Sequence, residues 1–412
     1  MQVSQAVILC GGRGERLRPL TDNLPKPMVL VNGRPFLQYL LEQLAENGIH
    51  RFVLLTGYLG EKIVEYFGDG STWGWSISYS HGPLEWSTAK RIHEAVDQID
   101  EQFLLLYSDN FAQLRLSELT QINVDNDSAL TLSVARKSPG NIQLGANSSV
   151  AKYDSGRSES SADFVEIGYM LVAKGKISNH LEKRESESFS SVIKNLVEAR
   201  QVTALTVNSG YQSISDPVRL KTTAAYLRNH RILLLDRDGT LNVKPRRGEY
   251  VNSVEDFQWI ESSKDALRSL GQRGFSFIII SNQAGIATGA TKPESLEEIN
   301  EFIRSEFLSL GLKLLEIHVC TDHWTSKSEF RKPNPGMFFS AANDHNFRLD
   351  HSIYVGDDER DALAAENAGC KCVLVSPENV YAEQHLKVMA IGKTLKDLVP
   401  TIINKYESWE IK

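Results

Sequence analysis

Hydrophobic and polar positions follow two alternating patterns along the first 110 residues of the chain. Short apolar runs at Ala6–Leu9, Arg51–Thr56 and Phe103–Tyr107 predict buried strands. Between these runs, Phe36–Asn47 and Gly60–Phe67 carry apolar residues at the three- and four-residue spacing of a helix. This alternation of strand and helix predicts a mostly parallel sheet that is covered by helices on both faces.

A second alternating series begins after residue 230, and no internal repeat relates it to the first. Strands are predicted at Ile232–Leu235, Phe275–Ile280 and Ile353–Val355, and helices at Ser263–Gly271 and Pro293–Leu310. Each predicted strand ends in a polar cluster, which is where ligands bind in open α/β sheets. The sequence therefore predicts an α/β protein with two doubly wound, mostly parallel-sheet domains.

The length of 412 residues favours two or three domains at roughly 150 residues each. The helical stretch Val218–Leu227 is expected to close the first domain, with the boundary near Arg228–His230. We predict domains at 1–228 and 229–412, and a closing helical segment over Lys387–Tyr406.

Charge and composition narrow the class of protein. Acidic residues outnumber basic ones by 52 to 45, and the resulting net charge of −7 argues against nonspecific binding of nucleic acid. The longest apolar runs fall far short of the ~20 residues that a membrane span needs, and the N-terminus does not resemble a signal peptide. Four cysteines are too few for a disulfide framework. We expect a cytoplasmic protein with neither a membrane nor a nucleic-acid partner.

A glycine-rich loop follows the first predicted strand. Its glycines, Gly11, Gly12 and Gly14, allow backbone N–H groups to approach a triphosphate closely. Arg16 can bind phosphate through two hydrogen bonds, and two prolines fix the backbone around Lys26. Taken alone, such a loop can also be an ordinary tight turn.

The longer string, from this loop to the Pro-Lys-Pro-Met sequence at Pro25–Met28, resembles the signature of the sugar-1-phosphate nucleotidyltransferases. The resemblance covers about the first 110 residues and implies a Rossmann-like domain whose substrate is a nucleoside triphosphate. It implies that the loop holds the nucleotide, that Arg16 and Lys26 contact phosphates, and that Asp109 holds Mg²⁺. The other interpretation of Asp109 is an ordinary residue of a strand-end turn.

The later part of this domain departs from the family pattern. Glu85 and Trp86 replace glycine and other small residues of a segment that closes over the base, and Glu15 replaces a small hydroxyl residue. Ser213 stands where the family has a second metal-binding aspartate, and Asp216 lies three residues further on. Two alternatives stay open for the first domain: nucleotidyl transfer, which these departures would slow, or nucleotide binding without transfer.

The strongest chemical signal is an Asp-x-Asp pair, Asp236 and Asp238, directly after a buried strand. One carboxylate can attack phosphorus as a nucleophile while the other protonates the leaving oxygen, so that hydrolysis passes through an aspartyl-phosphate. Ser281 can donate to the phosphoryl oxygens, Lys332 supplies a cation, and Asp357 completes an oxygen-rich Mg²⁺ site with the pair. The sequence therefore predicts a magnesium-dependent phosphatase.

These motifs, in this order, resemble the haloacid dehalogenase (HAD) superfamily of phosphatases over about Ile232–Val375. Within it, the sequence around them resembles the D-glycero-D-manno-heptose 1,7-bisphosphate phosphatases, with the histidinol-phosphate phosphatases as close relatives. The resemblance implies an HAD-like fold and assigns substrate binding to Asn282, Arg331 and Asp361.

One departure concerns zinc. The subgroup often binds structural Zn²⁺ through a Cys-x-His and a Cys-x-Cys, but here only Cys320 of that set is kept and Ser328–Phe330 replace the later pair. Because a structural zinc needs four ligands, we expect Mg²⁺ as the cofactor and no zinc. His318 and His323 are interpreted as loop or packing histidines.

The two resemblances fit consecutive steps in the synthesis of a nucleotide-activated heptose for a cell-surface polysaccharide such as lipopolysaccharide, or for a glycoprotein. The leading hypothesis is a bifunctional enzyme that acts on sugar phosphates and a nucleotide. The alternatives are a phosphatase whose first domain only binds nucleotide or sugar phosphate, a phosphatase of the histidinol-phosphate type, and a catalytically silent regulatory or scaffold protein. The sugar, its anomer, the base and the oligomeric state stay open.

Overall fold

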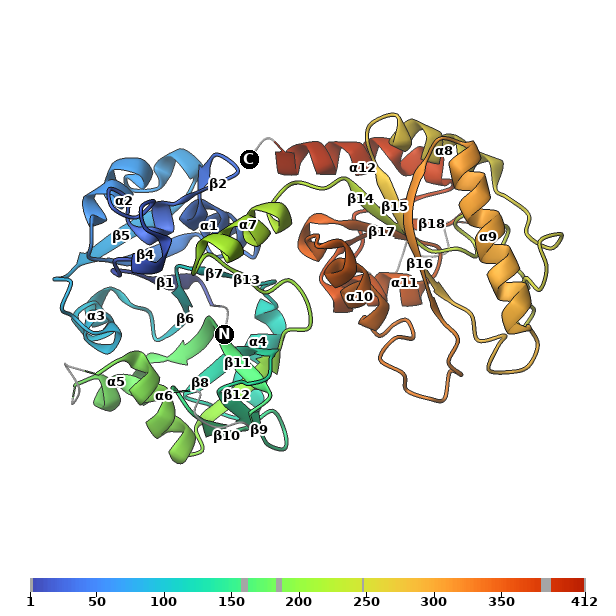
Figure 1. The fold of residues 1–412 in the computed structure, drawn as a ribbon. Helices are drawn as coiled ribbons and strands as arrows, with labels where there is room; N and C mark the ends of the chain where they lie inside the picture. Colours follow the sequence, from blue (N-terminus) through green and yellow to red (C-terminus); the bar gives the residue numbers. More distant parts are fainter. Residues whose placement is uncertain (1–2, 157–161, 183–186, 247, 379–386, 411–412) are drawn as a thin grey trace. The chain divides into compact units, whose positions relative to one another are not determined.

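A computed structural model describes residues 3–156, 162–182, 187–246, 248–378 and 387–410 of the chain (Figure 1). The chain divides into two compact units, Met1–Leu227 and Arg228–Lys412, which we call the N-terminal unit and the C-terminal unit. Whether 1–228 and 229–412 fold independently stays a prediction.

One half of the N-terminal sheet is parallel and contains the three predicted strands together with one, Ser76–His81, that was not predicted. Its strands are β1 (Gln5–Cys10), β4 (Arg51–Thr56), β5 (Ser76–His81) and β6 (Gln102–Tyr107), in the order β5-β4-β1-β6. All six residues of β1 are buried, with Ile8 in the core on one face of the sheet and Val7 in the core on the other. Strand β1 therefore needs helices on both faces, as a doubly wound sheet provides.

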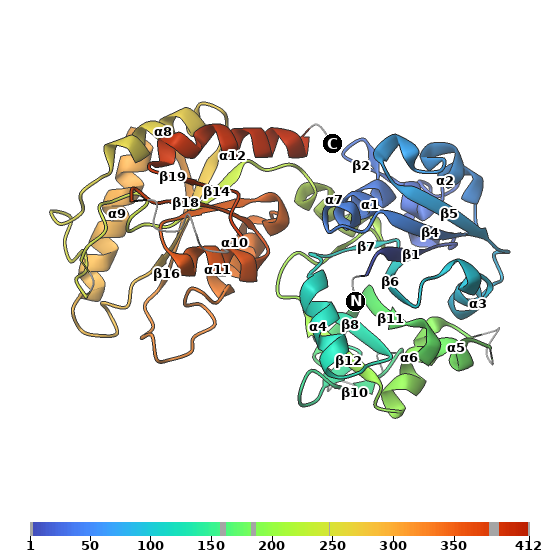
Figure 2. The ribbon, with the colours of Figure 1, turned by 180° about the vertical axis from the view of Figure 1, so that it is seen from behind.

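The other half of this sheet was not predicted. Strand β11 (Phe164–Ala173) runs antiparallel to both β6 and β8 (Leu130–Arg136). Strand β12 (Val202–Thr206) is parallel to β8, while β9 (Ile142–Leu144) and β10 (Val150–Tyr153) pair antiparallel at the edge. Figure 2 shows the arrangement from behind.

The helices of the N-terminal unit cover the two faces of its sheet (Figure 1). They are α1 (Phe36–Glu46), α2 (Gly60–Phe67), α3 (Thr88–Glu94), α4 (Leu116–Asp125), α5 (Lys174–Glu182), α6 (Phe189–Glu198) and α7 (Pro217–Tyr226).

Two small antiparallel pairs complete the N-terminal unit. Strands β2 (Leu30–Val31) and β3 (Arg34–Pro35) form one pair. Strands β7 (Asn110–Phe111) and β13 (Gln212–Ser213) form the other, and Ser213 lies opposite Asn110. The second pair brings the end of this unit beside the end of β6.

The C-terminal sheet is parallel throughout. Its order is β16-β15-β14-β17-β18-β19, in which neighbours are hydrogen-bonded. The strands are β14 (Ile232–Leu235), β15 (Ser276–Asn282), β16 (Lys313–Cys320), β17 (Ile353–Gly356), β18 (Lys371–Val375) and β19 (Ala390–Gly392). The helices are α8 (Glu261–Gly271), α9 (Pro293–Ser309), α10 (Gly336–His345), α11 (Glu359–Ala368) and α12 (Leu395–Glu410). Leu233 and Leu235 join the core on one face, and Leu234 joins the core on the other.

The prediction of one helical segment over Lys387–Tyr406 was wrong in its first part. Ala390–Gly392 forms the edge strand β19, and only Leu395–Glu410 is helical. The reason is tertiary, because backbone groups of Ala390–Gly392 pair with those of Val373–Val375 in β18. From the sequence alone, a short apolar stretch fits either a strand or part of a helix, and only the neighbouring strand decides between them.

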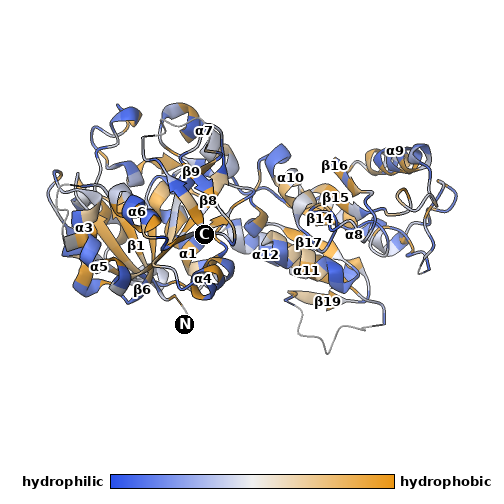
Figure 3. Cartoon of the chain, turned by 90° about the horizontal axis from the view of Figure 1, so that it is seen from below, coloured by the Kyte–Doolittle hydropathy of each residue, from blue (hydrophilic) through white to orange (hydrophobic). Residues whose placement is uncertain are grey.

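Colouring by hydropathy shows the apolar strands inside each unit and polar positions on the helix surfaces (Figure 3). The predicted α/β fold class, with mostly parallel sheets, is confirmed. Among the described residues, no helix is both long enough and apolar enough to cross a membrane.

Candidate active sites

The ends of the C-terminal strands β14, β15 and β17 border a cleft of about 990 Å³. Asp236 and Asp238 follow β14, Ser281 and Asn282 end β15, and Asp357 follows β17. Parallel strands place their carboxyl ends at one edge of the sheet, which is why groups far apart in the sequence meet here. All the residues predicted for the phosphatase line this cleft: Asp236, Asp238, Ser281, Asn282, Arg331, Lys332, Asp357 and Asp361.

A buried lysine lies at the centre of the cleft. The Lys332 Nζ donates to Asp236 Oδ1 at 2.7 Å, to Asp361 Oδ1 at 2.8 Å and to the Tyr354 hydroxyl at 2.7 Å. Its side chain is only 4% exposed. Burial alone would lower the pKa of Lys332, but the two carboxylates raise it above its ordinary value, so the cation is kept.

Three carboxylates, those of Asp236, Asp357 and Asp361, have oxygens within 4.8 Å of one another. Burial, together with the neighbouring carboxylates, raises the pKa of Asp236 to about 8 and that of Asp357 to about 6, despite the cations beside them. Asp357 Oδ2 accepts from the exposed Lys244 at 2.7 Å. A buried, all-oxygen, mutually repelling group is a donor set that suits a hard cation such as Mg²⁺. The described residues therefore fit the expected ion.

The carboxylate of Asp361 has hydrogen-bond partners within the protein on both of its oxygens. Its Oδ1 accepts from Lys332 and Tyr354, and its Oδ2 accepts from the backbone N–H groups of Asp357 and Asp358, both at 3.1 Å. The carboxylate is buried, and both of its oxygens already bind protein groups. Through these contacts the carboxylate orients Lys332 and the loop that carries Asp357, and the assignment of Asp361 to substrate binding stays a prediction.

Asp238 is not a member of the three-carboxylate group. Its oxygens accept from the guanidinium of Arg237 at 2.9–3.2 Å, from Asn242 Nδ2 at 2.9 Å and from Gln283 Nε2 at 2.8 Å. Burial acts to raise the pKa of Asp238, but Arg237 and these hydrogen bonds lower it below its ordinary value. The Asp238 side chain is therefore oriented separately from the group that would hold a cation.

Asn282 and Ser281 hold other parts of the site. Asn282 donates to the backbone carbonyl of Lys332 and accepts from its N–H, both at 3.1 Å, so this side chain fixes the Lys332 loop. Ser281 is buried and its hydroxyl accepts from Gln283 at 2.9 Å. Gly239 (φ +92°) packs against Asp357, where a Cβ would lie 2.1 Å from a carboxylate oxygen. Only glycine allows so close an approach.

Sequence reasoning missed much of the rim of this cleft. The missed residues are Lys244, Arg246, Tyr250, Trp324 and Arg360, which line the cleft with the predicted Arg331. The basic stretch at 244–247 was a signal in the sequence, but Trp324 and Arg360 carry none without the fold.

The N-terminal unit has its own cleft, of about 910 Å³, at the end of β1 and β6. The predicted residues Gly11, Gly12, Gly14, Arg16, Lys26 and Asp109 all line it. Lys26 Nζ lies 2.5 Å from Asp109 Oδ2, and Arg16 is exposed. Arg13, Arg91 and Arg219 also line this cleft, so several cations face one cavity.

The glycine loop has two built-in constraints. Gly14 has φ +65°, and a Cβ there would lie 2.8 Å from the Lys26 Cβ. Gly11 packs on the guanidinium of Arg91, which donates to the backbone carbonyls of Thr56, Gly82 and Pro83. A Cβ on Gly12 would meet no protein atom within 4 Å. Arg91 thus supports the loop from behind, a role that the sequence did not indicate.

The departures from the family pattern have unequal consequences. Glu85 is exposed and does not line the cleft, whereas Trp86 does. Ser213 is buried and accepts from Arg219 Nη1 at 3.1 Å.

Asp216 lines the same cleft but begins helix α7 as its N-cap, where Oδ1 accepts from the Arg219 N–H at 3.0 Å. Its carboxylate is therefore committed to the helix. An arginine stands beside Ser213, where the family has a carboxylate.

Cys320 and His323 do not share a metal-binding group with other described residues. Cys320 is buried with its thiol near Asp322, and the His323 ring bonds Thr325.

Comparison with known proteins matches each unit to a family. A family model described as "Nucleotidyl transferase" matches residues 5–145, and one described as "Polynucleotide kinase 3 phosphatase" matches residues 231–371. A "Probable glucose-1-phosphate cytidylyltransferase" of Bacillus subtilis is 32% identical, over 47% of this chain and 84% of the relative. A "D-glycero-beta-D-manno-heptose-1,7-bisphosphate 7-phosphatase" of Haemophilus ducreyi is 35% identical, over 42% of this chain and 98% of the relative.

One solved structure of a related phosphatase is also similar. It is the D,D-heptose 1,7-bisphosphate phosphatase of B. bronchiseptica complexed with magnesium and phosphate, which is 25% identical over 42% of this chain and 99% of that one, at a TM-score of 0.40.

The folds, the sites and these relatives define an enzyme that joins a nucleotidyltransferase unit to an HAD-like phosphatase unit. The chain belongs to the sugar-1-phosphate nucleotidyltransferase family in its first unit and to the heptose-1,7-bisphosphate phosphatase family in its second.

Proposed function

We propose that the C-terminal unit removes the 7-phosphate of a heptose 1,7-bisphosphate. The observation that carries this proposal is the buried Lys332 between Asp236 and Asp361 at the strand ends. Such a network holds one carboxylate at the floor of a cleft with the orientation and charge balance that phosphoryl transfer needs. The basic rim, with Arg246, Arg331 and Arg360, gives a second phosphate of the substrate a place to bind.

In this mechanism Asp236 attacks phosphorus, and the bond from phosphorus to the sugar oxygen breaks as the aspartyl-phosphate forms. Asp238, whose pKa Arg237 lowers, takes up a proton as the negatively charged substrate binds, donates it to the leaving sugar oxygen, and later takes a proton from the water that hydrolyses the intermediate. Arg237, Asn242 and Gln283 keep Asp238 oriented for both steps. Ser281 and Lys332 stabilise the phosphoryl oxygens, with Lys332 held in place by Asp361 and Tyr354.

Mg²⁺ fits this site, with Asp236 and Asp357 as the side chains that would hold it. When bound, the ion supplies positive charge that offsets the charge on the phosphoryl group and on the carboxylates. Burial, together with the neighbouring carboxylates, raises the pKa of Asp236 and Asp357, and this supports the assignment. The carboxylate of Asp238, which was also expected to hold the ion, accepts a hydrogen bond from Arg237, and its role as a metal ligand stays a prediction.

We propose that the N-terminal unit transfers a nucleotidyl group to the resulting sugar 1-phosphate. The glycine loop with Arg16 and Lys26 supports triphosphate binding, and Asp109 supports a bound Mg²⁺. The attacking group is the phosphate of the sugar, and the leaving group is pyrophosphate. These reactions belong in the cytoplasm, where nucleoside triphosphates are available, and the product is a nucleotide-activated heptose for a cell-surface polysaccharide such as lipopolysaccharide.

The phosphatase proposal is tested by phosphate release from a panel of sugar monophosphates and bisphosphates and histidinol phosphate. The expected result is a clear preference for a heptose 1,7-bisphosphate, loss of activity with EDTA and recovery with Mg²⁺. A preference for histidinol phosphate would replace the heptose assignment, and full activity in EDTA would contradict the proposed ion.

The transferase proposal is tested by calorimetry with ATP, GTP, CTP and UTP and by pyrophosphate release with heptose 1-phosphate. Pyrophosphate release that depends on both substrates supports transfer. Binding of one nucleotide without release would favour the second candidate, a unit that only binds, for which the Ser213–Arg219 contact is the specific observation.

A further inference from the structure

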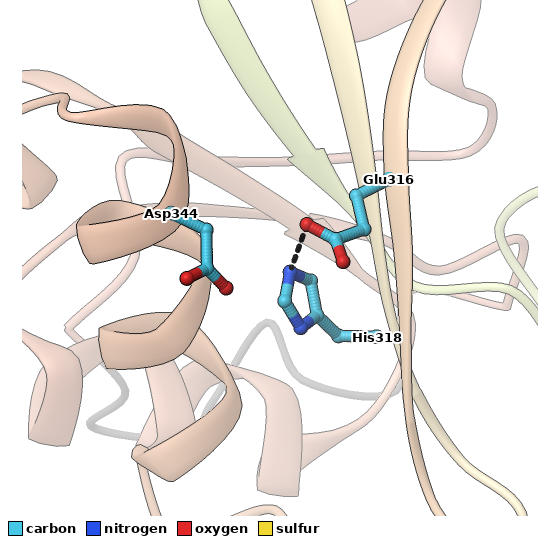
Figure 4. Close-up of side chains that lie close together, drawn as sticks. All are labelled: Glu316, His318 and Asp344. Carbon is cyan, nitrogen blue, oxygen red and sulfur yellow. Dashed lines mark ion pairs between the residues drawn. The ribbon is translucent and has the colours of Figure 1, made fainter.

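A second group of metal-binding side chains lies in the C-terminal unit, away from the phosphatase cleft. Glu316 and His318 come from the edge strand β16, and Asp344 and His345 come from the last turn of α10, which packs on that strand. Figure 4 shows Glu316, His318 and Asp344 converging between the strand and the helix. None of these residues lines the cleft.

The donor atoms of this cluster are close together. Ligand atoms of Glu316, His318 and Asp344 all lie within 4.8 Å of one another. Both imidazoles approach one carboxylate oxygen, Glu316 Oε2, with His318 Nε2 at 3.2 Å and His345 Nε2 at 2.9 Å. In a tetrahedral zinc site with bonds of about 2.0–2.2 Å, ligand atoms lie about 3.3–3.6 Å apart. His345 is not one of the three residues whose ligand atoms all lie within 4.8 Å of one another, so side chains of the cluster would have to move closer for all four to hold one ion.

Two observations indicate that the cluster lacks a positive charge. His318 is 11% exposed, and its Nε2 is buried without a hydrogen-bond partner among the described residues, because the contact with Glu316 is a close approach of poor hydrogen-bond geometry. In the described part of the chain, neither Glu316 nor Asp344 pairs with a lysine or arginine. Buried nitrogen atoms of this kind are normally paired, and a cation would satisfy the ring and both carboxylates together.

We propose that Glu316, His318, Asp344 and His345 form a binding site for a divalent transition-metal ion, and that Zn²⁺ is the preferred ion. Two imidazole nitrogens with two carboxylate oxygens form a donor set that zinc accepts, whereas Mg²⁺ and Ca²⁺ prefer oxygen alone. This site joins the edge strand to α10, so its role is structural. It departs from the expectation of a zinc-free chain, which rested on the missing cysteines, and it gives His318 a role as a ligand.

The test uses the full-length chain, treated with a chelator, dialysed, and then loaded with Co²⁺ or Zn²⁺ in the presence of Mg²⁺. The expected result is one Co²⁺ per chain, with a visible spectrum of nitrogen and oxygen ligands and a thermal midpoint that rises with Zn²⁺. Asp344→Asn, at an exposed position, should weaken Co²⁺ binding by about tenfold or more. His318→Gln combined with His345→Gln should abolish the binding.

The matched control is His323→Asn, which changes the histidine of the cysteine loop and should leave Co²⁺ binding unchanged. Phosphate release with Mg²⁺ serves as the check that each variant is folded, and Asp344→Asn should keep it. The proposal is overturned if the untreated or loaded protein retains no transition metal. It is also overturned if the double histidine variant retains Co²⁺ as the wild type does, or if the spectrum shows thiolate ligands.

Discussion

The two clefts prepare for a phosphate substrate in different ways. In the C-terminal cleft the central cation is buried, and each of its hydrogen-bond donors has a partner on a different element: Asp236, Tyr354 and Asp361. In the N-terminal cleft Arg16 is exposed on a loop, and Lys26 contacts Asp109 near the surface. Buried, fully paired groups are oriented before the substrate arrives, and this orientation lowers a reaction barrier. Exposed cations mainly add affinity and attract the substrate.

This difference indicates how strongly substitutions in each cleft should affect stability and activity. Removing one partner from the buried network leaves an uncompensated charge, which affects folding as well as catalysis. We expect the N-terminal cleft to tolerate changes at exposed charges such as Arg16 more easily. The departures at Ser213 and Trp86 lie in that cleft.

The largest effect is expected for Asp236→Asn, which should lower phosphate release to below about a thousandth of the wild-type rate. The amide keeps the shape of the side chain but cannot act as the nucleophile. Nucleotide binding by the N-terminal unit should not change, and it is the control, measured by calorimetry on the same preparation. Retention of a tenth of the activity would remove Asp236 from the nucleophile role.

Asp238→Asn should slow the hydrolysis of a sugar phosphate by roughly 10²–10⁴-fold, because a general acid contributes about that much. The loss should be much smaller with p-nitrophenyl phosphate, whose leaving group needs no proton. Rates with both substrates, measured at equal Mg²⁺, give the comparison. An equal loss with both substrates would assign Asp238 to orientation of the site rather than to proton transfer.

Ser213→Asp is expected to increase pyrophosphate release by the N-terminal unit by about tenfold or more, since a metal contact in the transition state is worth about several kcal/mol. It tests whether the missing carboxylate limits this cleft. The matched control is Ser209→Asp, a buried serine that does not line the cleft. An unchanged rate in Ser213→Asp would show that the missing carboxylate does not limit this cleft.

The smallest expected effect is a difference in stability between variants at two glycines of the same loop. Gly14→Ala should destabilise the N-terminal unit by about 1–2 kcal/mol, because φ there is +65° and L-residues avoid that region. Gly12→Ala should leave stability unchanged, since a Cβ there meets no protein atom, and should weaken only nucleotide binding. Urea unfolding and calorimetry measure the two quantities. A loss of stability in Gly12→Ala would mean that the loop packs differently.

Much of the fold was predictable from local patterns. The strand expected at Ile232–Leu235 is β14, the strand expected at Arg51–Thr56 is β4, and the helix expected at Gly60–Phe67 is α2, each with the bounds predicted. These segments are fully or half buried, so their apolar residues recur at the spacing of a strand or a helix, and that spacing can be recognised in the sequence. The antiparallel half around β11 was missed because no strand was predicted at Leu130–Arg136 or Phe164–Ala173, and the direction of their pairing is decided only in the folded sheet.

The sequence by itself determined the two families, the fold class and those cleft residues that belong to short motifs, whereas most residues of the rims were missed. Only the tertiary structure decided what each side chain touches. It tied Asp238 to Arg237, turned Asp361 toward Lys332, placed Arg219 beside Ser213, and brought His318 to Asp344. Motifs record which groups a reaction needs, whereas the partner of a buried charge depends on which strand and helix pack against it.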